Sequence, residues 1–265
     1  MANPLVCFIT GASTGLGKGL ALRLARDGHS VGLAARREGL LEEVAGEIRA
    51  AGGAAGVYPC DVADARQVTD AIRKCEAELG PIDLLLANAG VSVNTRVEAF
   101  DAAAVERVIR VNLLGAVYAT ETVLPGMLER GRGQIVAVSS IAGFNGLPMS
   151  AAYSASKGAM TNFFESLRID LRGSGVDVTV ITPGFVKTPM TALNRHPMPF
   201  LMDLDPAVEL MVQAIYRRKK SLAFPWQLAS VAWCARFLPR PAYDWLVSRV
   251  ERGKAPEAGG PPAGE

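Results

Sequence analysis

A serine, a tyrosine and a lysine lie close together in the stretch from Ser139 to Lys157, which reads S-S-I-A-G-F-N-G-L-P-M-S-A-A-Y-S-A-S-K. Tyr153 and Lys157 are four positions apart, so a helix would present a phenol and an ammonium on one face. A neighbouring cation favours the phenolate and lowers the pKa of a tyrosine, which is ordinarily near ~10. Ser140, on the loop before the helix, adds a hydroxyl. These residue types predict proton transfer at a carbonyl or an alcohol, the alternative being a chance pair on a helix surface.

Composition and charge argue against several other kinds of protein. The 265 residues, 49% hydrophobic and 20% charged, suit one large α/β domain. A net charge of +2 gives no sign of a nucleic-acid-binding surface. Cys7, Cys60, Cys75 and Cys234 are scattered, which predicts reduced thiols rather than disulfides or a zinc site. With only two histidines, no metal centre is expected.

The beginning of the chain has no signal-peptide pattern, because it leads directly into a strand pattern at Leu5–Thr10. No segment offers roughly 18 uninterrupted apolar residues. We therefore expect a cytoplasmic protein without a membrane-spanning helix.

Short apolar runs alternate with helical patterns along the chain. The expected strands are Val6–Thr10, Ser30–Ala35, Gly56–Cys60, Ile82–Ala87, Gln134–Val138, Asp177–Ile181 and Ser221–Phe224. The expected helices are Leu16–Asp27, Glu38–Ala51, Ala65–Leu79, Ala102–Arg130, Tyr153–Arg172 and Pro206–Lys219. Continuous apolar strands are typical of a parallel sheet that is buried on both faces. The alternation predicts a single-domain, doubly wound Rossmann fold of class α/β, with about seven strands flanked by helices.

A glycine-rich turn follows the first strand and reads T-G-A-S-T-G-L-G from Thr10 to Gly17. Glycine permits a tight turn and the close approach of a pyrophosphate, and the N-terminus of the next helix offers free N–H groups. A turn of this kind between a strand and a helix predicts dinucleotide binding.

The end of the second strand indicates which dinucleotide. A chain that binds NAD often has a carboxylate there for the ribose 2′-hydroxyl. This chain has Ala35, Arg36 and Arg37 instead, and two guanidinium groups suit a 2′-phosphate. We expect NADP(H) to be preferred over NAD(H), unless both arginines are ordinary solvated residues at the start of a helix.

Taken together, the motifs over roughly residues 4–225 resemble the short-chain dehydrogenase/reductase family. The glycine turn matches its T-G-x-x-x-G-x-G pattern, and Asn88-Ala89-Gly90 matches its N-A-G motif, although Ala87 replaces the commoner first asparagine. Ser140 precedes Tyr153 by the usual interval, and Asn112 lies where the family has its asparagine. Pro183-Gly184 and Thr188 match its P-G-x-x-x-T segment.

The resemblance implies a catalytic role for four residues. Tyr153 would be the general acid in reduction and the base in oxidation. Lys157 would lower the pKa of Tyr153 and bind the nicotinamide ribose. Ser140 would bind the substrate oxygen, and Asn112 would hold a water that relays protons from Lys157.

The same resemblance, together with the turn chemistry, implies a set of residues in contact with the cofactor. They are Gly11, Ser13, Thr14, Gly15, Leu16, Gly17, Arg36, Arg37, Asp61, Val62, Asn88, Ala89, Gly90, Tyr153, Lys157, Pro183, Gly184, Val186 and Thr188.

Two segments, 141–150 and 186–205, are expected to form the substrate pocket. Besides Ser140 and Tyr153, the substrate-binding candidates are Phe144, Met149, Met190 and Leu193. Such side chains favour an apolar alcohol, ketone or aldehyde, of lipid, steroid or aromatic type. The alternative is that about half of the apolar residues in these segments pack beneath a lid.

The C-terminal part departs from the common family pattern. We expect a catalytic domain over 1–225, a helical extension over 226–252, and a disordered tail over 253–265 rich in glycine, proline and alanine. The extension is expected to pack on the domain or a second subunit, with peripheral membrane contact as the alternative. The resemblance implies a homodimer or homotetramer paired through 102–130 and 153–172.

The leading functional interpretation is an NADP(H)-dependent carbonyl reductase or alcohol dehydrogenase acting on a small apolar molecule. An NAD-dependent alcohol dehydrogenase of the same fold is the second. The third is a scaffold protein that binds the nucleotide without turnover, which the presence of all four catalytic residue types disfavours.

Overall fold

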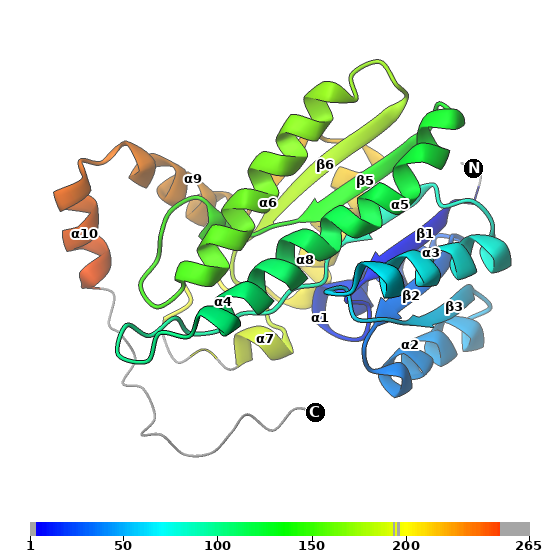
Figure 1. Ribbon diagram of the computed structural model, residues 1–265, viewed down its shortest axis with the longest axis horizontal. Helices are drawn as coiled ribbons and strands as arrows, with labels where there is room; N and C mark the ends of the chain where they lie inside the picture. Colours follow the sequence, from blue (N-terminus) through cyan, green and yellow to red (C-terminus); the bar gives the residue numbers. More distant parts are fainter. Residues whose placement is uncertain (1–3, 193, 195–196, 250–265) are drawn as a thin grey trace.

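A parallel sheet organises the chain in the computed structural model, which describes residues 4–192, 194 and 197–249 (Figure 1). Its strand order is β3-β2-β1-β4-β5-β6-β7. The strands are β1 (Val6–Thr10), β2 (Ser30–Ala35), β3 (Ala54–Pro59), β4 (Leu84–Ala87), β5 (Gly133–Val138), β6 (Val176–Pro183) and β7 (Ser221–Phe224). The order reverses between β1 and β4, so the predicted doubly wound α/β fold with a seven-stranded parallel sheet is confirmed.

Helices cover both faces of the sheet. They are α1 (Gly15–Arg26), α2 (Glu38–Ala50), α3 (Ala65–Leu79), α4 (Ala102–Ile109), η1 (Arg110–Leu114), α5 (Gly115–Glu129), η2 (Ile141–Gly143), α6 (Ala151–Asp170), α7 (Pro189–Ala192), α8 (Leu204–Tyr216), α9 (Trp226–Cys234), η3 (Ala235–Phe237) and α10 (Arg240–Ser248). Buried residues of α1, α2 and α8 form one core cluster, and those of α3, α5 and α6 form the other. Every position of β5 is buried, as expected for a strand between two helical layers.

The strand ends agree with the apolar runs to within a few residues, and three strands agree completely. The differences arise because hydrogen bonding to a neighbouring strand, and not hydrophobicity, decides where a strand begins and ends. Pro183, for example, belongs to β6 because its register continues to Phe224 in β7.

The helix predicted over Ala102–Arg130 is continuous over 102–129, but it contains a π-helical turn that the sequence analysis did not predict. Asp101 caps its start, accepting hydrogen bonds from the N–H groups of Ala103 and Ala104. A π-helical turn, η1, then separates α4 from α5. One inserted residue leaves the apolar periodicity almost unchanged, so the sequence pattern does not reveal it, and such turns are frequent at functional sites.

The C-terminal helices α9 and α10 extend from the end of β7 and lie at one end of the molecule (Figure 1, left). The residues predicted to be a tail, 253–265, and the last residues of the predicted extension lie outside the described part. Among the described helices, none combines the length and the hydrophobicity needed to cross a bilayer.

Two helical glycines provide a matched test of the packing at the first turn. A Cβ on Gly17 of α1 would lie 2.1 Å from the Gly11 carbonyl oxygen, whereas a Cβ on Gly46 of α2 would meet no atom within 4 Å. Gly17→Ala should therefore lower the free energy of unfolding by about 1–3 kcal/mol. Gly46→Ala should raise it by about 0.5–1 kcal/mol, because alanine favours a helix. Urea unfolding measures both, and equal effects would contradict the packing assigned to Gly17.

Candidate active site

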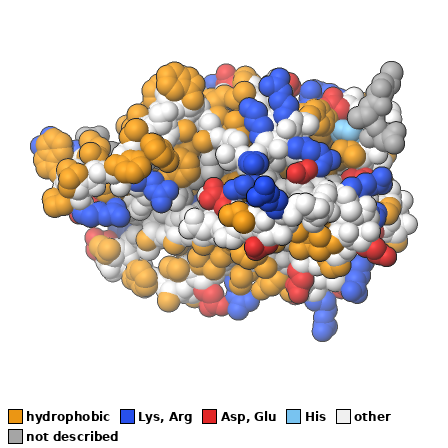
Figure 2. All heavy atoms as spheres, turned by 90° about the horizontal axis from the view of Figure 1, so that it is seen from above, with side chains coloured by type: hydrophobic (Ala, Val, Ile, Leu, Met, Phe, Trp, Pro, Cys, Tyr) orange, Lys and Arg blue, Asp and Glu red, His pale blue; other side chains and the backbone are white. Residues whose placement is uncertain are grey.

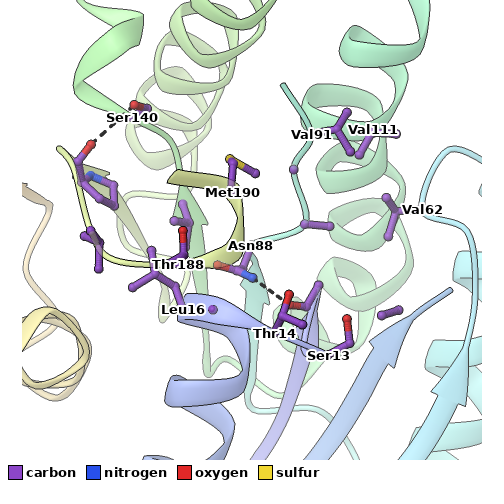
Figure 3. A pocket seen from close by; sticks show the side chains of 18 of the residues that line it. Ser13, Thr14, Leu16, Val62, Asn88, Val91, Val111, Ser140, Thr188 and Met190 are labelled. Atoms are coloured by element: carbon purple, nitrogen blue, oxygen red, sulfur yellow. Dashed lines mark hydrogen bonds between the residues drawn. The ribbon is translucent and has the colours of Figure 1, made fainter. Parts of the chain in front are cut away.

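A cleft of about 350 Å³ lies along the carboxyl ends of the strands, at the point where the strand order reverses. Ligands of doubly wound sheets bind at this position. Most of the predicted cofactor residues line it: Gly11, Ser13, Thr14, Gly15, Leu16, Arg36, Arg37, Asp61, Val62, Asn88, Ala89, Gly90, Tyr153, Lys157, Pro183, Gly184, Val186 and Thr188 (Figure 3). Gly17 does not line the cleft, because it packs behind the turn against Gly11.

The glycine turn is held to the end of β4 by hydrogen bonds. The Thr10 hydroxyl oxygen accepts from the N–H groups of Asn88 (3.0 Å) and Ala89 (3.1 Å). The Asn88 amide in turn donates to the carbonyl oxygens of Thr10 (3.0 Å) and Gly11 (3.2 Å). Gly11 and Gly15 have positive φ angles of 67° and 57°, which favour glycine. Thr14 precedes α1 without a side-chain cap, which leaves N–H groups at the helix start for an anion.

Two arginines border the far end of the cleft. Arg36 and Arg37 are exposed, and neither side chain forms a hydrogen bond or an ion pair with any residue that the structure describes. Asp61, which follows β3, also lines the cleft, and its carboxylate accepts a hydrogen bond from the Ala63 N–H (3.0 Å). The guanidinium groups are thus the charged side chains at this end without a partner among the described residues, which suits a phosphate group.

Tyr153 and Ser140 meet at the other end of the cleft. A hydrogen bond with the Ser140 hydroxyl lowers the pKa of Tyr153, but burial has the larger effect and raises this pKa above its ordinary value. The Ser140 hydroxyl also accepts from the Ala142 N–H (3.1 Å) and lies 3.5 Å from the Pro183 carbonyl oxygen (Figure 3). The net shift of the Tyr153 pKa is therefore upward, because burial has the larger effect, whereas the sequence predicted a lowered pKa.

The Lys157 ammonium lies against a main-chain carbonyl near the Tyr153 ring. Its Nζ atom donates to the Val138 carbonyl oxygen (2.8 Å) and lies 6.0 Å from the centre of the Tyr153 ring. Lys157 is only 3% exposed, and burial lowers its own pKa to about 8. The ammonium is therefore the group whose charge changes near neutral pH, while the phenol remains protonated.

Asn112 is fully buried on η1 and does not line the cleft. Its side-chain oxygen accepts from the Val91 N–H (2.7 Å), and its amide donates to the Val91 carbonyl (3.0 Å) and to the Ser156 hydroxyl (2.9 Å). A Cβ on Gly90 would lie 3.4 Å from Lys157 Nζ and 3.5 Å from the Asn112 oxygen. Asn112 and Lys157 thus both lie next to Gly90 of the N-A-G turn.

Three hydroxyl groups that the sequence interpretation left out hold α6 in place. Ser156 donates to the Tyr153 carbonyl oxygen (2.7 Å). Ser139 donates to the Lys157 carbonyl oxygen and accepts from the Thr161 hydroxyl, both at 2.8 Å. Ser156 and Thr161 lie three and four positions after Tyr153 and Lys157, a helical spacing that could have drawn attention to them.

The substrate candidates divide into three groups. Met190 lines the cleft, together with Val91, Val111 and Thr191, which sequence reasoning did not single out. Phe144 and Met149 are not part of the lining. Leu193 lies outside the described residues.

The described residues include no group of three His, Cys, Asp or Glu side chains placed to hold a metal ion. The cleft therefore offers backbone N–H groups, hydroxyls, two free guanidinium groups and a buried ammonium. These groups fit a phosphate-bearing dinucleotide, and the Ser140–Tyr153 pair suits a carbonyl or hydroxyl oxygen.

Comparisons with known proteins agree with this site. A family model described as short chain dehydrogenase matches residues 5–198. An uncharacterized oxidoreductase of Myxococcus xanthus (strain DK1622) is 48% identical over 243 residues, covering 92% of this chain and 96% of that protein.

Two solved structures are similar to most of the chain. A variant of actinorhodin polyketide ketoreductase with NADPH has a TM-score of 0.79 and 28% identity, covering 86% of this chain and 98% of that one. A 3-oxoacyl-[acyl-carrier protein] reductase with bound NAD from Brucella melitensis has a TM-score of 0.74 and 26% identity, covering 83% and 89%. The family model, the relative and the similar structures all point to the same family. The chain belongs to the short-chain dehydrogenase/reductase family of NAD(P)-dependent oxidoreductases.

Proposed function

We propose that this chain is an NADP(H)-dependent reductase of apolar ketones or aldehydes. The observation that carries the proposal is the hydrogen-bonded pair of Tyr153 and Ser140 at the end of a cleft that also holds a buried lysine. When bound, the nicotinamide would supply the hydride. The protein's own residues would position the substrate oxygen and deliver a proton to it.

The protonation state of Tyr153 favours reduction. Because burial raises the pKa of this phenol, the group carries its proton at neutral pH. A protonated phenol is a general acid that can donate to the oxygen of a carbonyl as it is reduced. Alcohol oxidation would instead require its deprotonation.

Ser140 and Lys157 would support that proton transfer from two sides. The Ser140 hydroxyl can donate to the same substrate oxygen, stabilising the charge that develops there. The Lys157 ammonium is fixed by the Val138 carbonyl and stabilises negative charge on Tyr153 once the proton has left. Asn112, held by Val91 and Ser156, would keep the backbone beside the lysine in place.

Arg36 and Arg37 support the preference for NADP(H). The two similar solved structures are named with NADPH and with NAD, so the fold alone does not decide between the cofactors. Here β2 ends at Ala35, which offers no carboxylate for a ribose hydroxyl, and both guanidinium groups border the cleft without a partner among the described residues. A 2′-phosphate would complement their charge.

The apolar substrate is supported by apolar side chains of the cleft. Met190, Val91 and Val111 are among its lining residues, and the similar solved structures are named as a ketoreductase and a 3-oxoacyl reductase.

We also propose a homodimer or homotetramer that pairs through α5 and α6, where Leu128, Phe163 and Ile169 are exposed.

Replacing Tyr153 by Phe should reduce kcat by at least about 10²-fold, because it removes the general acid. NADPH affinity should be nearly unchanged. Tyr118→Phe on α5 is the matched control and should retain activity. Steady-state kinetics with an apolar ketone and calorimetric titration with NADPH measure the two effects. Substantial turnover by the Tyr153 variant would refute the assigned role.

The rate of carbonyl reduction should depend on the charge of Lys157. Because the pKa of Lys157 is lowered to about 8, its charge is present below that pH and is lost above it. We therefore expect kcat/KM for reduction to be highest below pH 8 and to fall as the pH rises through 8. A pH–rate profile at saturating NADPH tests this, and a decline starting only near the ordinary lysine value of 10.5 would contradict it.

Calorimetric titration with NADPH and NADH tests the arginines. The wild type should bind NADPH at least about tenfold more tightly, a difference of about 1.4 kcal/mol. Arg36→Ala combined with Arg37→Ala should remove this difference and leave NADH affinity unchanged. Arg73→Ala, an exposed arginine of α3, is the control. Equal affinity of the wild type for both cofactors would overturn the phosphate assignment.

A further inference from the structure

The C-terminal segment α9–η3–α10 exposes an unusual set of side chains. All three tryptophans of the chain lie on it, and each is more than half exposed: Trp226 by 71%, Trp233 by 53% and Trp245 by 56%. Val231, Phe237, Leu238 and Leu246 are exposed beside them. Figure 2 shows the hydrophobic side chains gathered at the end of the molecule where α9 and α10 lie (left). We call these seven exposed apolar side chains the C-terminal apolar surface.

This surface is not turned toward the domain. Within α9 only Ala229 is buried, and within α10 only Tyr243. The exposed aromatic rings contact one another instead: Trp233 and Phe237 pack edge to face with ring centres 4.9 Å apart. Burial against the rest of the chain therefore does not account for the tryptophans.

The charges on the segment indicate what it contacts. Arg236, Arg240 and Arg249 are exposed, and the guanidinium of Arg249 lies 3.7 Å from the centre of the Trp245 ring. Asp244 is the one acidic residue between 226 and 249. Tryptophans flanked by arginines suit the boundary between headgroups and acyl chains of an anionic bilayer.

The same charges argue against a second copy of the chain as the occupant. A two-fold contact brings each surface against itself. Such a contact would gather six guanidinium groups, twice the three of one copy, against only two carboxylates. Anionic lipid headgroups complement this charge, whereas a second copy repeats it.

We propose that the C-terminal apolar surface docks the enzyme on anionic phospholipid membranes. Two hydrogen bonds attach the segment to the loop that follows Ser140: the Asn145 amide donates to the Ala232 carbonyl, and the Tyr243 hydroxyl donates to the Gly146 carbonyl, both at 2.6 Å. Docking would therefore bring the end of the cleft that holds Ser140 and Tyr153 near the lipid surface, where apolar molecules concentrate. The docking itself does not depend on the proposed reaction.

Flotation of the full-length protein with vesicles tests the proposal. We compare phosphatidylcholine vesicles with vesicles that also contain about 30% phosphatidylserine, and we follow tryptophan emission, which arises only from this segment. The wild type should bind the anionic vesicles at least about tenfold more tightly, with a blue shift of the emission and weaker binding at high salt.

Two double variants should each weaken binding by at least about tenfold. Trp233→Ala with Phe237→Ala removes apolar contacts, and Arg236→Glu with Arg240→Glu reverses charge. The matched controls carry the same kinds of change elsewhere and should bind as the wild type does: Phe100→Ala with Leu210→Ala, and Arg66→Glu with Arg73→Glu on α3. Because all the changed side chains are exposed or partly exposed, reduction of a soluble ketone should persist in every variant.

Three outcomes would overturn the proposal. The first is that the wild type floats with neither kind of vesicle. The second is that the controls lose binding to the same extent as the two test variants. The third is an oligomer, detected by analytical ultracentrifugation without lipid, that the two test variants abolish while no protein floats. That result would assign the surface to a second copy of the chain.

Discussion

The burial of one ammonium group, that of Lys157, is the constraint on which the site depends. A charge that is removed from water is costly unless it is compensated, and here one main-chain carbonyl, that of Val138, accepts from it. The cost lowers the pKa of the lysine to about 8, so its charge is retained at neutral pH but is easily lost. The position of this group follows from how α6 lies against the end of β5. Ser139, at that end, bonds both the Lys157 carbonyl and Thr161.

The π-helical turn also contributes a side chain, that of Asn112, to the surroundings of this site. It places Asn112 where a single side chain bonds the backbone of Val91 on both its polar groups and also reaches Ser156 on α6. Ser156 in turn bonds the Tyr153 carbonyl. The N-A-G turn, the central helix and the tyrosine helix are therefore joined through one buried amide. This arrangement accounts for the presence of a π-helical turn, which is rare, at this point of the helix.

Different physical effects determine the properties of the two ends of the cleft. At the end formed by the glycine turn, backbone geometry is decisive. The features are positive φ at Gly11 and Gly15, the hydrogen bonds from Asn88, and a helix start without a side-chain cap. At the end that holds Ser140 and Tyr153, the main effect is side-chain burial, which shifts the pKa values of Tyr153 and Lys157. The C-terminal segment extends from this second end, held by Asn145 and Tyr243. Surface chemistry and active-site chemistry are thus adjacent in space although α9 and α10 come after the seven strands.

The sequence by itself determined the sheet, the glycine turn and the group of Ser140, Tyr153 and Lys157, because these depend on local signals: apolar runs, glycine at tight turns, and helical spacing. Only the tertiary structure decided the direction of the Tyr153 pKa shift, since burial of the phenol raises this pKa more than the hydrogen bond with Ser140 lowers it. It also decided that Gly17 packs behind the cleft, that Asn112 lies in a π-turn, and that Phe144 and Met149 do not line the cleft. A residue's surroundings come from segments distant in the chain, and desolvation and packing depend on those surroundings, so one-dimensional patterns do not carry them.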